Sequence, residues 1–349
     1  MENCKKMGIR TGFLILMVLI ALIGCGQVQK VPLSRCAQLR GIPGPADLAV
    51  EQRSAFGGDR LIIASQARRG SDPEGEYLEQ GRMLFVPLSG SNRNDVLEFS
   101  FSGRDEYPFH PEGMDVVDSG GSHFLIVANH ARKDQHAIEV FRIERTSLNF
   151  ITRYRHEFFE YPVDVVALGS EEFYVLNRRS ASGLQNIAMS SVFLGSGSLV
   201  YVNGNQFFRV LSNLKDPSSI SLSPDQSKIW INVAGSSSIR IYQRGSGPDL
   251  QPVASVGLPS TPGRGAFLDS SRYLVTGIPS GWDLSRHESN PANLASSQVF
   301  SLATSNGSLA LAYQDQGEEI SGAYGIAVRS NQLFLGPRYD DYVLACTYP

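Results

Sequence analysis

Asp164-Val165-Val166-Ala167-Leu168 and Phe173-Tyr174-Val175-Leu176-Asn177 are two short apolar runs separated by a polar turn of four residues. Valine and aromatic residues are frequent in both runs, and neither run contains glycine or proline, so both are predicted to be β-strands. Nearly every position is apolar, which is typical of strands whose two faces are both buried. The pair therefore predicts a hairpin in the interior of a β-sheet protein.

This unit recurs six times along the chain. Its six copies begin near Asp47, Gly113, Asp164, Ile220, Gly265 and Gly325. Successive copies start 45 to 66 residues apart, and propeller blades have periods of about 40 to 50 residues that insertions lengthen. Amphipathic strands between the pairs, such as 137–143 and 238–242, bring the unit to four strands. The sequence predicts an all-β, six-bladed β-propeller.

The sixth unit has only three clear strands, the last at 342–346. We expect the N-terminal stretch from Val31 to Cys36 to supply the fourth, paired beside Cys346, because that closure hides both sheet edges. A pair of β-sandwiches with accidental spacing is the alternative. No linker or shift in composition divides the chain, so residues 31–349 are predicted to form a single propeller domain.

Composition agrees with a turn-rich β protein and argues against one class of partner. The chain has 349 residues, 42% of them hydrophobic, with 34 glycines and 18 prolines. Its net charge is −3, and no run of five or more basic residues occurs. Phosphate backbones require clustered cations, so nucleic acid is not an expected partner.

The N-terminus resembles a secretory leader. Three basic residues precede an apolar run that ends at Ile23, and small residues then lead to Cys25. Residues 22–25, Leu-Ile-Gly-Cys, resemble a bacterial lipobox. We therefore expect a cleaved signal peptide at 1–24, lipid on Cys25, and a short tether at 25–30 that holds the domain at a membrane. An uncleaved anchor helix is the alternative.

Two predictions follow from the cysteines and from the residue after the lipid. Gly26 is not the aspartate that resembles an inner-membrane retention signal, so a Gram-negative host would place the protein at the outer membrane. Cys4 lies in the leader and Cys25 carries the lipid, which leaves Cys36 and Cys346 in an oxidising compartment. These two are expected to form a disulfide that fastens the ends of the ring.

Several segments, in order along the chain, resemble the paraoxonase/arylesterase family. They are 36–41 with 44–48, 109–113, 127–130, 137–143, 164–174 and 220–225. The resemblance covers about Cys36 to Cys346. It implies a six-bladed propeller with two calcium ions in its central tunnel, one structural and one that polarises an ester or lactone carbonyl, with histidines nearby that handle the proton.

The resemblance assigns the structural calcium to Asp47, Asp164 and the backbone carbonyl of Met114. Both carboxylates are present, and each lies at the start of an inner strand. Calcium prefers six to eight oxygen ligands, so converging carboxylates are the expected donors. Either aspartate alone would be read as a turn or strand cap. Together they predict one structural calcium ion.

The catalytic calcium ligands of the family do not recur. Their positions map to Ala46, Val163, Ser218 and the pair Arg264-Gly265, none of which is a carboxylate or amide. A second, catalytic calcium is therefore doubtful, because a guanidinium repels a cation.

The family histidines map to Glu112, which replaces one, and His130, which retains the other. Glu112, Arg264 and Ser218 would form a network at the tunnel mouth, with Arg264 in place of the metal charge. Such a network is either a structural salt bridge or a rebuilt site. In a rebuilt site Arg264 would hold a small anionic or carbonyl group, with Glu112 and His130 as acid and base.

Other chemistry finds little support. The chain has no Gly-x-Ser-x-Gly motif for a serine nucleophile and no zinc-ligand spacing. The mildly apolar segment from Gly183 to Tyr201 is compatible with a short helix above the tunnel, and His287 resembles a surface or turn residue. Two functions remain: an ester or lactone hydrolase with altered or lost activity, and a non-catalytic binding propeller of the cell envelope.

Overall fold

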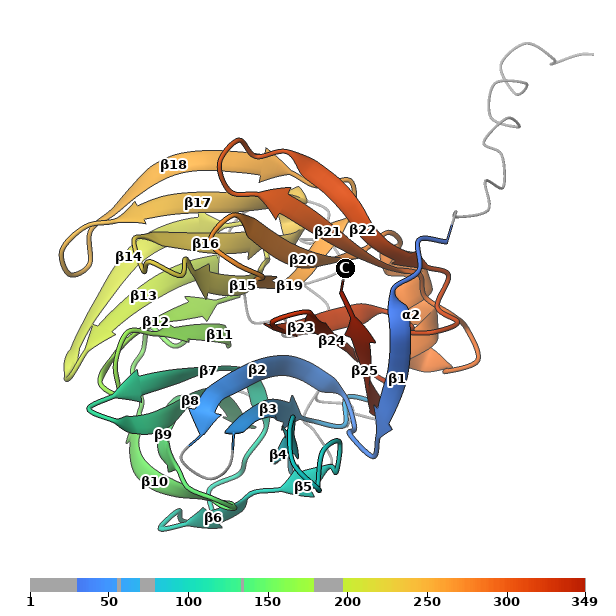
Figure 1. Ribbon diagram of the computed structural model, residues 1–349. Coiled ribbons are helices and arrows are strands. Elements are labelled where there is room, and N and C mark those ends of the chain that lie inside the picture. Colours follow the sequence, from blue (N-terminus) through green and yellow to red (C-terminus); the bar gives the residue numbers. More distant parts are fainter. Residues whose placement is uncertain (1–29, 55–57, 70–78, 133–134, 179–196, 349) are drawn as a thin grey trace, which may run out of the picture.

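The computed structural model describes residues 30–348, apart from 55–57, 70–78, 133–134 and 179–196. Six sheets of mainly antiparallel strands are arranged around a central tunnel, and each extends from an innermost strand at the tunnel to the rim (Figure 1). The predicted all-β, six-bladed propeller is confirmed. The leader, the lipidation site at Cys25 and nearly all of the tether lie outside the described residues.

The blades are built from consecutive strands, counted here from the tunnel outward. Blades 1 and 2 contain β2 (Pro45–Ser54), β3 (Gly58–Ser65), β4 (Arg82–Pro87) and β5 (Leu97–Glu98), then β7 (Pro111–Ser119), β8 (Ser122–Arg132), β9 (Gln135–Ile143), β10 (Ser147–Tyr154) and the parallel edge strand β6 (Ser100–Ser102). Blades 3 and 4 contain β11 (Pro162–Ala167), β12 (Glu172–Asn177), β13 (Gly197–Asn203) and β14 (Gln206–Leu214), then β15 (Pro217–Leu222), β16 (Lys228–Val233), β17 (Ser238–Arg244) and β18 (Leu250–Gly257). Blades 5 and 6 contain β19 (Thr261–Phe267), β20 (Arg272–Ile278), β21 (Ser297–Ala303) and β22 (Leu309–Asp315), then β23 (Ala323–Arg329), β24 (Gln332–Pro337), β25 (Tyr342–Thr347) and β1 (Ser34–Arg40).

The core lies between neighbouring blades, which explains the apolar runs of the inner strands. Phe173 and Val175 of β12 belong to the core between blades 2 and 3, whereas Tyr174 and Leu176 belong to the core between blades 3 and 4. All four side chains are almost completely buried. Successive residues of a strand point to opposite faces, so both sets must be apolar when a blade is covered on both sides.

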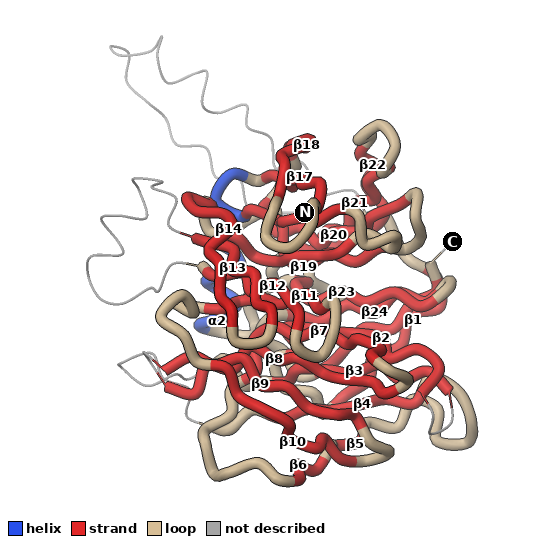
Figure 2. Tube along the Cα trace, turned by 90° about the vertical axis from the view of Figure 1, so that its left-hand side faces the viewer, coloured by secondary structure: helices blue, strands red, loops and turns tan. Residues whose placement is uncertain are grey.

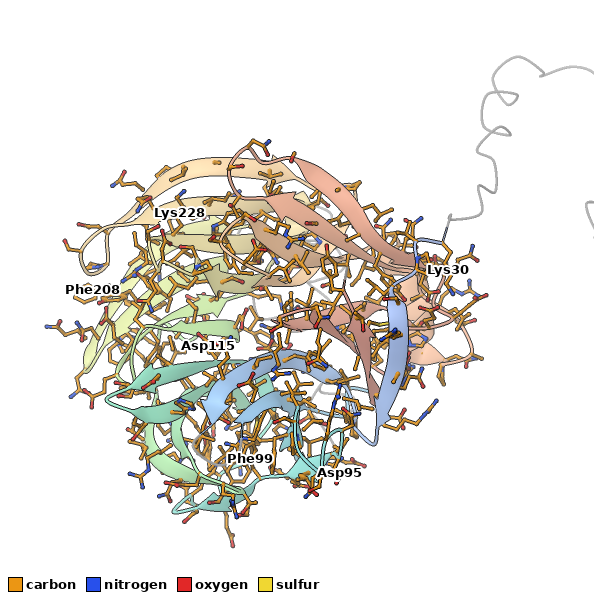
Figure 3. The ribbon with its side chains drawn as sticks, in the orientation of Figure 1. Lys30, Asp95, Phe99, Asp115, Phe208 and Lys228 are labelled. Carbon is orange, nitrogen blue, oxygen red and sulfur yellow. A yellow bond between two sulfur atoms is a disulfide. The ribbon has the colours of Figure 1, made fainter. Side chains whose placement is uncertain are left out.

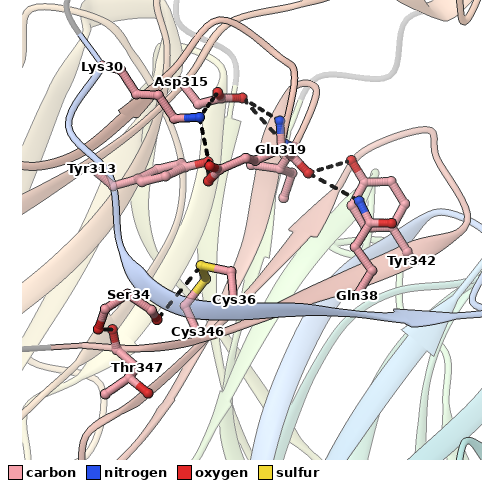
Figure 4. The surroundings of a disulfide bond; sticks show 11 residues. Lys30, Ser34, Cys36, Gln38, Tyr313, Asp315, Glu319, Tyr342, Cys346 and Thr347 are labelled. Atoms are coloured by element: carbon pink, nitrogen blue, oxygen red, sulfur yellow. Dashed lines mark hydrogen bonds and ion pairs between the residues drawn. A yellow bond between two sulfur atoms is a disulfide. The ribbon is translucent and has the colours of Figure 1, made fainter.

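The ring is closed by strand pairing and a covalent bond. β1 pairs antiparallel with β25, with Ala37 opposite Ala345, and Cys36 is joined to Cys346 (Figure 4). The predicted closure and disulfide are confirmed. The N-terminal strand runs from Ser34 to Arg40 rather than from Val31 to Cys36, because its register against β25 is centred beyond the cysteine.

Helices are few among the described residues. A 3₁₀ turn (η1, Ala234–Ser236) follows β16, and α2 (Gly281–Ser289) follows β20, on the face of the disc shown at the left of Figure 2. The helix expected within 183–201 is wrong for residues 197–201, which lie in β13 (Gly197–Asn203), and residues 183–196 lie outside the described residues. No described helix has the length and apolarity needed to cross a bilayer.

Candidate functional site

Every inner strand carries an irregularity at the same place. The register of each inner strand shifts just after its first residues, for example between Pro111 and Gly113 and between Pro162 and Asp164. Such bulges re-aim side chains and are frequent beside functional sites. The residues at these shifts, here called the bulge ring, are Ala46, Glu112, Val163, Ser218, Gly263 with Arg264, and Tyr324. The bulge ring marks one end of the tunnel, which we call the upper mouth.

Arg264 crosses the tunnel from blade 5 and lies between two aspartates. Its Nη1 is 2.5 Å from Oδ1 of Asp164 and 3.5 Å from Oδ2 of Asp47. Its Nη2 donates to the backbone carbonyls of Glu112 at 2.7 Å and Val163 at 2.9 Å. Arg264 and both aspartates are at most 5% exposed. The guanidinium thus joins blades 1, 2, 3 and 5 at the axis.

The two aspartates also bind backbone amides of the next blade. The amide of Met114 donates to Oδ2 of Asp47 at 2.6 Å, and the amide of Ile220 donates to Oδ2 of Asp164 at 2.8 Å. These bonds fasten blade 1 to blade 2 and blade 3 to blade 4. Met114 therefore offers Asp47 its N–H. The resemblance had assigned its carbonyl oxygen to a metal.

The residues at the axis do not fit the structural calcium that the family implies. The position between Asp47 and Asp164 is filled by the guanidinium of Arg264, and the amide of Met114 supplies a donor to the cluster. A calcium site needs six to eight oxygen acceptors around a space free of other cations. Within the described residues, no group of three or more His, Cys, Asp or Glu side chains could hold a metal ion.

Burial controls the protonation of this cluster. Burial and the nearby charge of Asp164 raise the pKa of Asp47 to about 8, although Arg264 opposes the shift. Burial would lower the pKa of Arg264, but Asp164 and Asp47 raise it above its usual range. Burial also raises the pKa of Asp164, although Arg264 opposes the shift, and the shorter contact makes Asp164 the closer ion-pair partner of Arg264.

Glu112 pairs with a residue that the sequence did not single out. Nη2 of Arg68 lies 2.8 Å from Oε2 of Glu112, and both side chains are buried. Burial alone would raise the pKa of Glu112, but Arg68, His130 and two further arginines lower it below its usual range. Glu112 is therefore ionised at neutral pH and is a poor proton donor. Its carboxylate pairs with Arg68, and its backbone carbonyl binds Arg264.

His130 lies beside the bulge ring as a neutral imidazole. Its Nε2 is 2.5 Å from the carbonyl oxygen of Pro162, so Nε2 carries the hydrogen and Nδ1 is the acceptor. Burial lowers the pKa of His130 to about 3, although Glu112 opposes the shift. The ring of Tyr161 packs edge-on at 4.3 Å between centroids. A neutral imidazole is the form that a general base requires.

Ser218 is held by the backbone of the neighbouring blade. Its Oγ lies 2.9 Å from the carbonyl oxygen of Pro262 and 3.1 Å from that of Gly263. A hydroxyl has one hydrogen to donate, and this one is directed at main-chain acceptors. Ser218 thus fastens blade 4 to blade 5 and is a poor candidate for a nucleophile. The predicted network of Glu112, Arg264 and Ser218 is therefore split among separate partners.

A cavity of about 260 Å³ lies in the tunnel on the side of Arg264 and its two aspartates that faces away from the upper mouth. Asp47, Asp164 and Arg264 form its inner end, and Asp115 on β7 lines its wall. Figure 3 shows Asp115 near the tunnel, whereas Phe208 lies at the rim of the disc. The axial cluster thus separates this lower cavity from the upper mouth.

Sequence reasoning missed several residues near the upper mouth. Arg178 directly follows β12 and Arg338 directly follows β24, at equivalent places in two blades. That equivalence was the signal available in the sequence. His287 was expected near the surface. It lies on α2 and is only 1% exposed, and its Nε2 is 3.0 Å from Oδ1 of Asp340.

Comparison with known proteins gives a consistent result. A family model described as Arylesterase matches residues 78–347. Serum paraoxonase/arylesterase 2 of Bos taurus is 24% identical over 322 residues, covering 90% of this chain and 89% of its own length. Serum paraoxonase/arylesterase 1 of Homo sapiens is 23% identical, covering 89% of this chain and 88% of its own length.

Solved structures share the fold at lower identity. The calcium-binding protein regucalcin of Agrobacterium tumefaciens has a TM-score of 0.57 at 10% identity, covering 90% of this chain and 94% of its own. A gluconolactonase of Xanthomonas campestris has a TM-score of 0.55 at 13% identity, covering 92% and 93%.

Proposed function

The chain belongs to the arylesterase family, and we propose that it is a membrane-tethered, ester- or lactone-binding propeller that uses no calcium in its tunnel. The family match and the gluconolactonase-like fold support an ester- or lactone-hydrolase-like propeller. The finer proposal concerns what this chain does with such a ligand. Its residues favour binding at the upper mouth, with hydrolysis altered or lost.

The placement of Arg264 carries this proposal. Its guanidinium is fixed by two carboxylates and two backbone carbonyls, at a position where the family would hold a metal. The guanidinium occupies the space between the two carboxylates, and its positive charge repels a second cation there. A built-in cation of this kind supplies the charge that holds the blades together and excludes calcium from the same space.

The remaining candidates give little support to ordinary hydrolysis. Ser218 donates to the backbone, and Glu112 is ionised against Arg68. Nη2 of Arg264 donates to two backbone carbonyls, and Nη1 forms ion pairs with Asp164 and Asp47. Stabilising an oxyanion requires donors aimed at the developing charge. Binding without turnover is the function that these contacts favour.

A metal-free hydrolase is the second candidate, and His130 is the observation that favours it. The neutral imidazole, with Nε2 donating to Pro162, leaves Nδ1 as the ring atom that would accept a proton from water, and the lowered pKa makes it a weak base. This candidate predicts turnover that survives chelation and is lost in His130→Gln.

Tethering rests on the sequence and on one compatible structural feature. The Cys36–Cys346 disulfide fits an oxidising compartment such as the cell envelope. Metabolic labelling with a fatty-acid probe should mark the wild-type chain and leave Cys25→Ala unlabelled. Equal labelling of both chains would contradict lipid attachment at Cys25.

The deciding test is calcium content together with esterase activity. The purified full chain would be exchanged into metal-free buffer, analysed for bound calcium, and assayed with phenyl acetate and a six-membered lactone, with and without EDTA. We expect no stoichiometric calcium and no EDTA-sensitive turnover. One or two bound calcium ions with EDTA-sensitive turnover would overturn the proposal. Turnover insensitive to EDTA would select the second candidate.

A further inference from the structure

The lower cavity is a second space in the tunnel, and it plays no part in the function proposed for the upper mouth. Its volume is about 260 Å³, and Arg264 with Asp164 and Asp47 forms its inner end. Pockets for drug-sized ligands measure about 300–1,000 Å³. The lower cavity therefore suits a ligand of only a few heavy atoms.

Asp115 on the cavity wall has the same kind of backbone partners as Asp47 and Asp164 but a different electrostatic setting. Each of the three carboxylates accepts the amide of the following residue and one amide of the next blade. The guanidinium of Arg264 is directed at Asp164 and Asp47. Among the residues that the structure describes, none forms an ion pair with Asp115. Its carboxylate thus lines the cavity without a protein cation beside it.

The carboxylate of Asp115 is held in place and still has acceptor capacity. The amide of Val116 donates to its Oδ1 and the amide of Ala167 donates to its Oδ2, both at 2.8 Å. Ala167 belongs to blade 3, so the carboxylate is fixed between two blades. An ionised carboxylate has about four acceptor positions, and these amides occupy one on each oxygen. A donor that enters the cavity can bind at the others.

Beyond Asp115, the cavity wall is an apolar belt to which every blade contributes one side chain. The belt residues lie in the second half of the inner strands, which run away from the upper mouth. The belt consists of Val50, Val116, Val166, Leu222, Phe267 and Val328. The cavity therefore has acceptor oxygens toward the axial cluster and apolar carbon toward the other end of the tunnel. Such a wall matches a ligand with a polar head and a short apolar body.

We propose that the lower cavity binds a small primary alkylammonium ion, whose ammonium group is held by the carboxylate of Asp115 and whose alkyl chain lies against the apolar belt. The three N–H donors of an ammonium group match the open acceptor positions of the carboxylate. Hydrogen bonds between ionised partners are stronger than those between neutral ones. The belt removes the alkyl chain from water.

The lining favours a primary ammonium over other cations. A quaternary ammonium has no N–H and cannot donate to Asp115. Calcium and magnesium require about six or more oxygen ligands. Within the described part of the chain, no group of three or more His, Cys, Asp or Glu side chains could hold a metal ion. The side chains of the apolar belt also have no oxygen to offer such an ion.

The experiment compares n-butylammonium, 1-butanol and tetramethylammonium by calorimetric titration of the full chain at constant ionic strength. Butanol has the same alkyl chain without the charge, and tetramethylammonium has the charge without the N–H donors. Because burial raises the pKa of Asp115 to about 7, the titrations are done at pH 8, where the carboxyl is mostly ionised. We expect butylammonium to bind most tightly of the three.

Three variants locate the binding. Asp115→Asn should weaken the Kd of butylammonium by about 10-fold, because it removes a charge-assisted hydrogen bond. Val50→Phe keeps the carboxylate, narrows the apolar belt and should also weaken binding. Asp118→Asn, on the same strand with a side chain that is 65% exposed, is the matched control and should bind as the wild type does. Thermal melting without ligand shows that each variant is folded.

Butylammonium binding that is weakened in folded Asp115→Asn and Val50→Phe, and unchanged in Asp118→Asn, would support the proposal. If Asp115→Asn does not fold, Val50→Phe and the three probes on the wild type decide the question. Butanol or tetramethylammonium binding as tightly as butylammonium would overturn the proposal. So would unchanged binding in the folded variants of the cavity, or no saturable binding to the wild type. None of these results bears on calcium content or esterase activity, so the function proposed for the upper mouth is tested separately.

Discussion

The seam and the axis both keep this propeller closed, and they do so by different means. At the seam, β1 pairs with β25 and Cys36 bonds to Cys346, so main-chain hydrogen bonds and one covalent bond join the chain ends. At the axis, the charged group of Arg264 is buried against Asp164 and Asp47. The seam therefore depends on strand pairing and a covalent bond, whereas the axis depends on charge pairing, because buried charges are costly when unpaired.

The seam should give the larger loss of stability. Replacing both cysteines, as Cys36→Ser with Cys346→Ser, removes a cross-link between residues 310 apart. The chain-entropy model gives about 5 kcal/mol for a loop of this size, lost from the free energy of unfolding. Chemical denaturation of the oxidised wild type and the double variant measures it. A loss below about 1 kcal/mol would mean that β1 pairing alone closes the ring.

Replacing Arg264 at the axis should cause a loss of stability nearly as large as removing the disulfide. Arg264→Leu leaves Asp164 and Asp47 without their cation, and breaking a buried pair in this way costs about 3–5 kcal/mol. If Arg264 replaces a metal charge, millimolar calcium should raise the melting temperature of the variant and leave the wild type unchanged. Arg272→Leu, from an exposed pair on the same blade, should change stability little. Calcium that stabilises the wild type would contradict the proposed replacement.

The burial of His130 beside the bulge ring should make the stability of the protein depend on pH. Burial lowers its folded pKa to about 3, whereas an unfolded histidine titrates near 6.5, so the unfolded chain binds more protons between these values. Stability attributable to His130 is therefore present above pH 6.5 and is lost as the pH falls, by about 2 kcal/mol from pH 7 to 5. Denaturation of the wild type and His130→Asn at both pH values isolates this contribution. If the wild type and His130→Asn lose the same stability between pH 7 and pH 5, His130 does not contribute to the pH dependence.

Lys30 should have the smallest effect at the seam. Its Nζ lies 2.7 Å from Glu319 and 3.8 Å from Asp315 (Figure 4), but the lysine side chain is 43% exposed. Exposed ion pairs contribute little because solvent and salt screen them. Lys30→Ala should leave the denaturation midpoint unchanged within error. A clear shift would show that the ion pair, and not only the disulfide, fastens the N-terminal strand.

Much of the fold was predictable because local patterns carry it. The apolar run at 164–168 reflects burial of β11 on both faces, and the repeat period reflects one blade per unit. Cys36 and Cys346, at the two ends of the predicted propeller, indicated the seam from the sequence alone. The helix α2 was missed, since its nine residues form a short insertion between β20 and β21 whose polar sequence gives little periodic signal.

For the candidate site, the sequence predicted which residues come together but not how they pair. Asp47, Asp164, Arg264, Glu112 and Ser218 do come together around the tunnel, but their pairing differs from the expected network. Arg264 was expected at the catalytic metal position beside Glu112, and it instead reaches one residue deeper to the aspartates. Pairing depends on distances across the ring, which sequence spacing does not encode.

By itself, the sequence determined the number of blades and the closure by two cysteines. These are properties of residue type and period. Only the tertiary structure decided that Arg264 lies between Asp164 and Asp47. The physical reason is that several carboxylates and carbonyls lie within reach of a long arginine side chain in a closed ring. Which of them it contacts depends on distances across the ring.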